Sequence, residues 1–184
     1  MGFYSNEKPY LWFFKNIIKK MKTFYLVRHA KSSWDNPDLR DEERPLNERG
    51  LKDAPFMAKL MKSKGVAPDL MVTSPAIRAL TTAAYFKMAL DVEGEDFWVR
   101  DDIYEALTVK ITDIIHRLPE DAETVMLFGH NPTFTNVANL FTNKFIDNIP
   151  TCGVVCIRSE AATWPEVNGS NSKVVETFFP KDFN

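Results

Sequence analysis

The chain has 184 residues but only two cysteines, Cys152 and Cys156, and no long apolar run. Two cysteines are too few for a disulfide framework or a four-cysteine metal site. Four positions apart on an expected strand, they would share one face at a separation too long for easy bridging. The longest apolar runs reach about five or six residues, whereas a membrane span needs roughly 20. We therefore expect a soluble, cytoplasmic protein with no membrane span.

An excess of charge of either sign is also missing. The 23 Lys and Arg against 25 Asp and Glu give a net charge of -2, which argues against a nucleic-acid binder held by a broad basic surface. A local anion pocket is still compatible with this balance, because net charge does not describe one pocket. The 45% of hydrophobic and 26% of charged residues are typical of one globular domain. We expect small molecules or proteins as partners, and no nucleic acid.

The first 22 residues differ in composition from the rest. An aromatic run at residues 10–14 precedes four lysines, Lys15, Lys19, Lys20 and Lys22. A secretory signal has its positive charge before the apolar core, so this order does not predict export. Two interpretations are open: an extension whose aromatic side chains pack on the domain or on a neighbouring chain, and an amphipathic segment that binds a membrane surface. We divide the chain into an N-terminal extension, residues 1–22, and one domain, residues 23–184.

From residue 23 onwards, short apolar segments alternate with helix-like ones. Strands are expected at residues 24–27, 70–72, 97–99, 125–128, 154–157 and 174–179, and helices at about 47–65, 75–90, 111–118 and 133–140. All-apolar strands are typical of a parallel sheet that is buried on both faces. Asn47 is the expected N-cap of the first helix, in which Pro55 either kinks the helix or moves its start to Asp53. Pro75 fits the first turn of the second helix. The pattern predicts an α/β domain with a mostly parallel central sheet.

Charged side chains gather where these elements begin or end. Arg28 and His29 follow the first strand, Arg78 lies in the first turn of the second helix, and His130 follows the fourth strand. Ligands of open α/β sheets bind beyond the carboxyl ends of the strands, so these side chains are expected to converge. The third histidine, His116, falls beside the apolar stripe of its helix and is expected to be solvated. Two arginines and two histidines predict a pocket for phosphate or another anion.

Four motifs then connect the chain with a known family. Residues 26–31, Leu-Val-Arg-His-Ala-Lys, resemble the Arg-His-Gly signature of the histidine phosphatase superfamily, also called phosphoglycerate mutase-like. The same order of motifs continues with Arg-Pro-Leu-Asn-Glu-Arg-Gly at 44–50, Thr-Ser-Pro-Ala-Ile-Arg-Ala-Leu-Thr-Thr at 73–82 and Gly-His-Asn-Pro at 129–132. The form at residues 28–34 most resembles the short SixA branch, the phosphohistidine phosphatases. The resemblance spans roughly residues 23–180 and implies a three-layer α/β/α sandwich.

The resemblance also implies roles for the converging side chains. His29 corresponds to the nucleophile that becomes a transient phosphohistidine, and Arg28, Arg78 and His130 to the groups that bind the phosphoryl oxygens, with His130 also counted as catalytic. The chemistry agrees, because a neutral imidazole is nucleophilic near pH 7 and fixed cations stabilise charge on the equatorial oxygens. No metal and no cofactor are implied.

The proton donor is less well defined. Glu105 lies between Arg78 and His130, where many members of the family have their acid, and Asp35 and Asp41 are rival carboxylates. Glu105 could instead cap the helix that follows it. Asp35 stands where related mutases often have a phosphate-binding asparagine, and we do not transfer that role to it. Ala30 replaces the usual glycine, which is tolerated unless the backbone there needs a positive φ.

The length of the chain bears on the substrate. Arg78 and His130 are only 52 positions apart, which leaves little chain for a lid over the pocket. An open site suits a phosphoryl group displayed on a protein, such as phosphohistidine on a histidine phosphotransfer domain, and this is the leading hypothesis. A phosphatase of small phosphate esters and a non-catalytic phosphate-binding module are the alternatives. A mutase must shield its phosphoenzyme from water and is less favoured.

Overall fold

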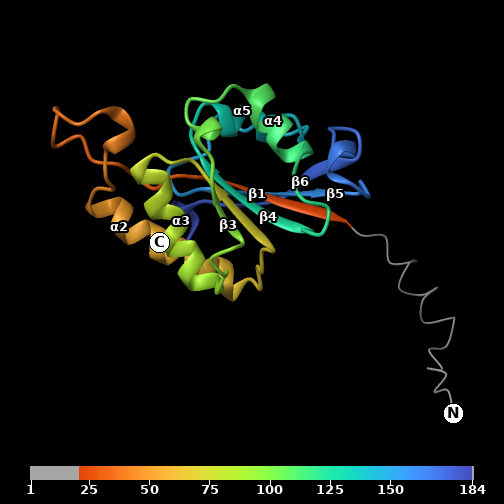
Figure 1. The fold of residues 1–184 in the computed structure, drawn as a ribbon, viewed down its shortest axis with the longest axis horizontal. Coiled ribbons are helices and arrows are strands. Elements are labelled where there is room, and N and C mark those ends of the chain that lie inside the picture. The colour runs from red at the N-terminus through yellow and green to blue at the C-terminus, as the bar shows by residue number, and fades with distance from the viewer. Residues whose placement is uncertain (1–20, 184) are drawn as a thin grey trace, which may run out of the picture.

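The computed structural model describes residues 21–183 and contains a central six-stranded sheet (Figure 1). The strand order is β3-β2-β4-β1-β5-β6. The first four strands in this order are parallel to one another, whereas β5 runs antiparallel to β1 and β6 antiparallel to β5. The expected mostly parallel sheet is therefore confirmed. The strands are β1 (Lys22–Arg28), β2 (Leu70–Thr73), β3 (Phe97–Val99), β4 (Thr124–Gly129), β5 (Val154–Ser159) and β6 (Ser172–Phe178).

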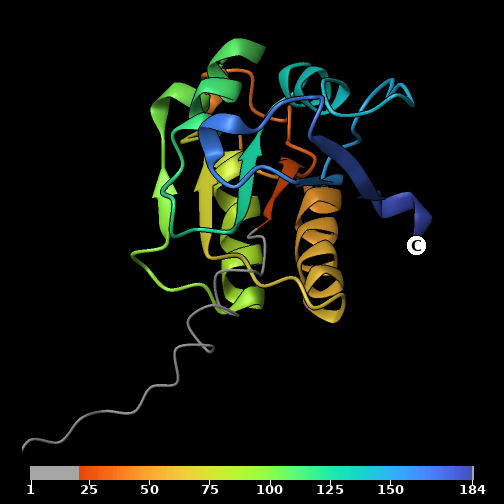
Figure 2. The same cartoon turned by 90° about the vertical axis from the view of Figure 1, so that its right-hand side faces the viewer.

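Helices cover both faces of the sheet. The pair α2 (Glu48–Ser63) and α3 (Ile77–Leu90) packs side by side on one face, and the pair α4 (Thr108–His116) and α5 (Thr133–Asn139) covers the other (Figures 1 and 2). Residues 21–183 also contain four short 3-10 helices. Three lie in connections, η1 (Asp41–Glu43), η2 (Asp101–Ile103) and η3 (Trp164–Glu166), and η4 (Pro180–Asp182) follows β6. This arrangement is the three-layer α/β/α sandwich that the resemblance implied.

Two apolar clusters hold the layers together. Alternate residues of β1 point to opposite faces, so Leu26 joins the cluster under α4 and α5 while Val27 joins the cluster with Met57 of α2 and Phe86 of α3. The four side chains are fully buried. Burial on both faces explains why β2 and β4 read as continuous apolar runs, whereas the edge strand β3 is largely exposed.

The N-terminal end of α2 follows its sequence signals. The Asn47 side chain accepts a hydrogen bond from the Gly50 amide at 2.9 Å, which satisfies one of the free donors of the first turn. Gly65, with φ of 73°, follows the helix at its other end. Pro55 lies inside the helix, so the alternative in which it moves the start to Asp53 is wrong. The Asn47 cap fixes the start instead.

Three local expectations need correction. Cys152 does not share a strand with Cys156: it lies in the turn before β5 with φ of 61°, although both thiols are buried and free. Pro75 is not in the first turn of α3, because Ala76 is the N-cap residue and its amide donates to the Ser74 hydroxyl. His116 is not a solvated flank, since its Nε2 atom hydrogen-bonds the Val167 carbonyl at 2.8 Å.

The expected extension over residues 1–22 lies outside the described residues, apart from its last two positions. Lys22 is already the first residue of β1, and its buried Nζ donates to the backbone carbonyls of Glu120 and Ala122. No helix within residues 21–183 is long and apolar enough to cross a membrane.

Candidate active site

The two strand-end histidines meet because β1 and β4 are neighbours. Arg28 lies opposite Gly129 in the parallel register, and the His29 amide donates to the Gly129 carbonyl at 3.0 Å. The next residues, His29 and His130, therefore leave the sheet at the same edge. Their ring centroids lie 5.1 Å apart. The two histidine side chains therefore converge, as expected from the sequence.

The surroundings of His29 fix the state of its imidazole. The ring is only 9% exposed, and Nδ1 lies 2.7 Å from the Ala30 carbonyl oxygen. A carbonyl only accepts, so Nδ1 carries the proton and Nε2 keeps its lone pair. Burial, together with the neighbouring His130 and Arg78, lowers the pKa of His29 to about 3. The imidazole is therefore neutral near pH 7, in the form that acts as a nucleophile.

His130 lies between the nucleophile candidate and the cavity. Its Nε2 atom is 2.8 Å from the Ser74 hydroxyl, and the Tyr104 ring meets the imidazole edge-on with centroids 5.7 Å apart. Burial and the positive charge of Arg78 lower the pKa of His130 to about 4. Its Nδ1 atom is buried and has no hydrogen-bond partner in the part of the chain that the structure describes.

Residues of the loop that precedes β5 bind the Arg28 guanidinium. Its Nη1 donates to the Ile149 carbonyl at 2.7 Å and to Asn148 Oδ1 at 3.3 Å. The Asn131 side-chain amide donates to the same two oxygens. Among the described residues, Arg28 Nε is a buried donor without a partner. Buried donors are normally satisfied, so a free one beside two histidines indicates room for an anionic ligand.

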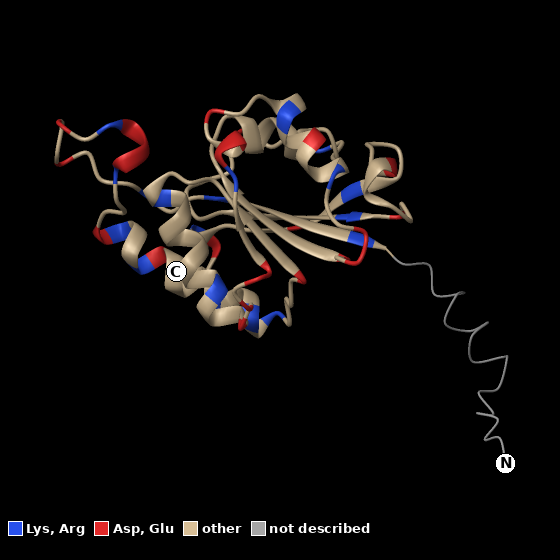
Figure 3. Ribbon diagram, viewed as in Figure 1, with Lys and Arg blue, Asp and Glu red and all other residues tan. Residues whose placement is uncertain are grey.

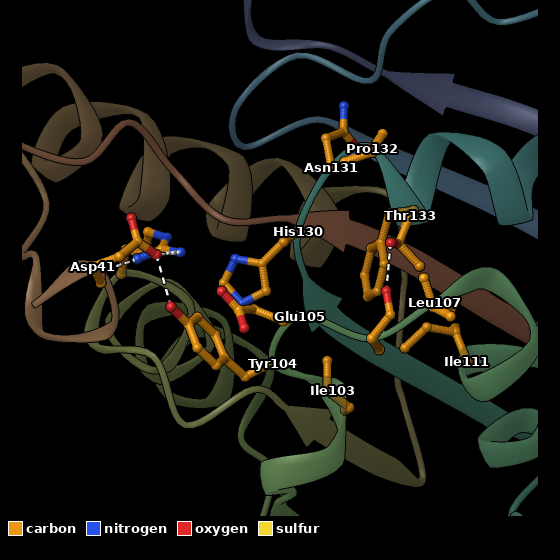
Figure 4. Close-up of a pocket in the computed structure, with 13 residues that line it drawn as sticks. Asp41, Ile103, Tyr104, Glu105, Leu107, Ile111, His130, Asn131, Pro132 and Thr133 are labelled. Atoms are coloured by element: carbon orange, nitrogen blue, oxygen red, sulfur yellow. Dashed lines mark hydrogen bonds and ion pairs between the residues drawn. The ribbon is translucent and has the colours of Figure 1, made fainter.

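A cavity of about 450 Å³ opens beside these groups (Figure 4). Arg78, His130 and Glu105 line it, whereas His29 and Arg28 are not among its lining residues. Glu105 is exposed and has φ of 53°, a left-handed backbone that is uncommon for a residue other than glycine. The structure thus places Arg28 and Arg78 beside the His29 and His130 imidazoles, and Glu105 on the wall of the adjoining cavity.

The two rival carboxylates lie in different surroundings. Asp35 is exposed, accepts a hydrogen bond from the Ser33 hydroxyl at 2.7 Å and does not line the cavity. Asp41 does line the cavity, and its Oδ2 atom lies 2.7 Å from Arg78 Nη2. The Tyr104 hydroxyl donates to the same oxygen at 2.9 Å (Figure 4). No sequence pattern predicts this pairing, because residues 31–46 have no periodicity.

Two further residues support the loop behind His29, and sequence reasoning assigned them no role. The buried Thr82 hydroxyl accepts from the Ala30 amide at 2.9 Å and donates to the Arg78 carbonyl at 2.7 Å. Ala30 does not have a positive φ, so alanine fits where the family usually has glycine. A Cβ on Gly50 would lie 2.2 Å from the Lys31 carbonyl oxygen, so glycine is required where α2 meets this loop. Both Thr82 and Gly50 belong to motifs quoted above.

Comparisons with known proteins agree with these motifs. Residues 24–106 match the model of the histidine phosphatase superfamily (branch 1). An uncharacterized chloroplastic protein of Arabidopsis thaliana is 29% identical over 77% of this chain and 68% of its own length. A 2,3-bisphosphoglycerate-dependent phosphoglycerate mutase of Novosphingobium aromaticivorans is 34% identical over only 45% of this chain and 35% of the mutase.

Solved structures extend the likeness to most of the chain. The "putative phosphohistidine phosphatase SixA from Agrobacterium tumefaciens" is 26% identical, with a TM-score of 0.73, over 85% of this chain and 97% of the other. A protein histidine phosphatase SixA complexed with tungstate shares the fold, with a TM-score of 0.74 and 18% identity over 88% of this chain and 99% of the other. The chain belongs to the histidine phosphatase superfamily. Within it the chain is a SixA-like member and a phosphatase.

Proposed function

We propose that the chain hydrolyses phosphohistidine on a protein through a covalent intermediate on His29. The observation that carries the proposal is the state of His29: it is buried and neutral, with Nδ1 protonated and Nε2 unprotonated. Arg28 and Arg78 are near enough to lower its pKa. A nucleophile that needs no prior deprotonation, beside two guanidinium groups, suits attack on an anionic phosphoryl group.

The reaction takes two steps. In the first, the lone pair of His29 Nε2 forms a bond to phosphorus as the bond from phosphorus to the substrate nitrogen or oxygen breaks. In the second, water attacks phosphorus, the bond to Nε2 breaks, and inorganic phosphate leaves. Arg28, Arg78 and His130 bind the equatorial oxygens, on which charge accumulates in both transition states. The free Nε of Arg28 is a donor that supports this role. Nδ1 of His130, which is also free, is a second donor in the tautomer whose Nε2 accepts from the Ser74 hydroxyl.

Glu105 is the proposed donor of the proton to the leaving group. It lines the same cavity as His130, and its left-handed backbone supports a functional role, because such conformations gather at active sites. A phosphohistidine substrate needs this proton less than an ester does, since its imidazole can leave already protonated. Glu105→Gln should therefore impair ester hydrolysis more than phosphohistidine hydrolysis.

The chain between Arg78 and His130 supports a macromolecular substrate. After α3 it holds β3, η2, α4 and β4, so within this described stretch no further helix is available to cover the cavity. An open site accepts a phosphoryl group that is carried on the surface of another protein. For a mutase the same openness is a disadvantage, because water would reach the phosphoenzyme.

Phosphorus NMR tests the proposal directly. A phosphohistidine-bearing phosphotransfer protein and a phosphoserine peptide are mixed with the enzyme and excess chelator, and phosphate release is followed. We expect the phosphohistidine signal to disappear selectively with the wild type and to persist with His29→Ala. His116→Ala is the matched control, because His116 bonds Val167 and does not line the cavity; it should behave as the wild type does.

The other outcomes are equally definite. Hydrolysis of the phosphoserine peptide alone would replace the proposal with a phosphatase of phosphate esters. Binding of phosphate without release of product from either substrate would indicate a phosphate-binding module. Loss of activity in the presence of chelator alone would contradict the mechanism without a metal.

A further inference from the structure

The arginine expected to bind phosphate on the cavity side already has an anionic partner. Arg78 is almost fully buried, and Nη2 lies 2.7 Å from Asp41 Oδ2. Its other terminal nitrogen, Nη1, donates to the backbone carbonyl of Asp41. Both terminal nitrogens of Arg78 thus face one residue of the loop between β1 and α2, 37 positions away in sequence.

The surroundings of the Asp41 carboxylate are those of a bound oxyanion. It accepts hydrogen bonds from three side chains on three segments: Arg78, the Tyr104 hydroxyl at 2.9 Å and Arg44 Nη1 at 2.8 Å. It lies in the cavity that His130 also lines (Figure 4). Partial burial raises the pKa of Asp41, but these three hydrogen bonds outweigh it and lower the pKa to about 2. The group is a carboxylate at neutral pH.

The segment that carries Asp41 lies at the surface of the domain. Figure 3 shows η1 as an acidic turn on a loop that extends from the body of the domain. None of its residues is buried, and the Asp41 side chain is 49% exposed. By contrast, Arg44 is firmly held: Nε donates to the Ser33 carbonyl, Nη2 to the Ser32 hydroxyl, and the guanidinium stacks on the Trp34 ring. Arg44 therefore tethers the carboxylate through Oδ1, while Oδ2 makes the contacts with Arg78 and Tyr104.

We propose that Asp41 is an internal competitor that occupies the phosphoryl-binding face of Arg78 and is displaced from it by the substrate. This inference rests on the proposed function. The phosphoryl group has up to twice the charge of the carboxylate and three oxygens to offer, so it can displace a partner that is half-exposed. When phosphate is the product, the returning carboxylate competes with it and favours its release. The site then selects against free phosphate, whose binding gains nothing from contacts to a carrier protein.

Equilibrium binding of inorganic phosphate, measured by titration calorimetry at fixed ionic strength, tests the competition without turnover. An apparent dissociation constant equals the intrinsic one divided by the competent fraction, so if Arg78 is free in about one molecule in ten, Asp41→Asn should bind phosphate about tenfold more tightly. Asp38→Asn is the matched control: it makes the same change three positions earlier, where the exposed carboxylate forms no ion pair among the described residues. Its phosphate affinity should equal that of the wild type.

A second substitution guards against a collapsed loop. Asp41→Ala removes the carboxylate without leaving an amide to bond Arg78, and it should tighten phosphate binding at least as much as Asp41→Asn. In an Arg78→Ala background the effect of Asp41→Asn should vanish, because the contested group is gone. Thermal melting of each variant accompanies the titrations.

Four results would overturn the inference. Unchanged or weaker phosphate binding in both Asp41 variants would mean that the carboxylate is structural or assists the ligand. Lost turnover with unchanged phosphate affinity would identify Asp41 as the proton donor instead. Equal tightening in the Arg78→Ala background would mean that Asp41 acts through general charge. If neither the wild type nor any variant binds phosphate or tungstate, the proposed phosphoryl site itself is wrong. If the wild type binds these anions but Asp41→Asn leaves the affinity unchanged, only the competition is wrong.

Discussion

The hydrogen bond between the Ala30 amide and the Thr82 hydroxyl provides a sharp test of how the nucleophile is positioned. Thr82 is fully buried on α3, and its Oγ1 accepts from the amide of the residue that follows His29. Replacing Thr82 by valine keeps the shape of the side chain and removes only the oxygen. The Ala30 amide, also fully buried, then has no acceptor.

The unsatisfied Ala30 amide sets the magnitude; the Arg78 carbonyl on α3 also loses the Thr82 hydroxyl as a donor. Leaving one buried donor unsatisfied costs about 1–3 kcal/mol. For a domain of this size, each kcal/mol lowers the melting temperature by about 2–4 °C, so the shift should be about 2–12 °C. The Ala30 carbonyl also holds Nδ1 of His29, so a displaced Ala30 peptide misaligns Nε2. A misplacement on the order of 1 Å can lower the rate by about a hundredfold, and kcat should fall by about tenfold to a hundredfold.

Thermal melting and steady-state hydrolysis of the phosphohistidine protein measure the two effects. Thr82→Ser retains the hydroxyl and should preserve kcat. Thr81→Val is the matched control, because Thr81 is half-buried and bonds neither Ala30 nor the Arg78 carbonyl. Stability and kcat of Thr82→Val equal to those of Thr81→Val would refute the reasoning, as would an equal loss of kcat in Thr82→Ser.

Three more predictions concern the histidines and the strand end before His130. His130→Ala should lower kcat by about 10²–10³, the cost of one lost oxyanion donor; unchanged single-turnover kinetics would remove His130 from the site. Gly129→Ala would place a Cβ 2.5 Å from the Phe134 ring, and overpacking of this kind lowers the free energy of unfolding by about 1–3 kcal/mol. A urea denaturation curve equal to that of the wild type would contradict this close contact between Gly129 and Phe134. The pKa values of His29 and His130 fall to about 3 and about 4 on folding, so the unfolded chain binds more protons below about pH 6.5. The free energy of unfolding should therefore fall as the pH is lowered from 6.5 towards 4, and this fall should be smaller in His29→Asn. If the free energy of unfolding of that variant depends on pH as it does in the wild type, His29 is not buried in its neutral form.

The sequence was informative wherever burial imposes a pattern. The segments of β2 and β4 are apolar because both faces of these strands are covered. This pattern predicts parallel strands, and the residues that follow β1 and β4 are therefore expected at the same edge of the sheet. The 5.1 Å between the His29 and His130 rings depends on more: β1 and β4 must be adjacent and in register. Strand order depends on contacts across about 100 positions of chain, which local periodicity does not record.

The remaining site contacts come from segments without a period. Asp41 was expected only as a rival acid, because its pairing with Arg78 joins an exposed turn to a helix 37 positions away. Cys152 was expected on a strand, yet its left-handed backbone lets its amide donate to the carbonyls of Arg28 and His29 at 3.0 and 3.1 Å. Cysteine is not a residue that signals such a turn. The roles expected for Asp41 and Cys152 rested on residue type, whereas their contacts with distant parts of the chain determine their place in the structure.

The charges at the candidate site bear on how a chain with a net charge of -2 could bind the anion that the proposed function requires. Burial keeps both imidazoles neutral near pH 7, so the two histidines contribute no positive charge. Under the proposed function, the attraction for phosphate therefore comes from Arg28 and Arg78. The ion pair with Asp41 offsets much of the charge on Arg78, and in the proposed competition a stronger anion replaces that carboxylate. Among the described residues, Arg28 forms no ion pair, so we expect the resting site to have about one unopposed guanidinium and a modest affinity for free anions. Under this arrangement, neutralising Asp41 should raise affinity for phosphate while leaving the neutral state of His29 unchanged, which separates the binding of the phosphoryl group from the readiness of the nucleophile.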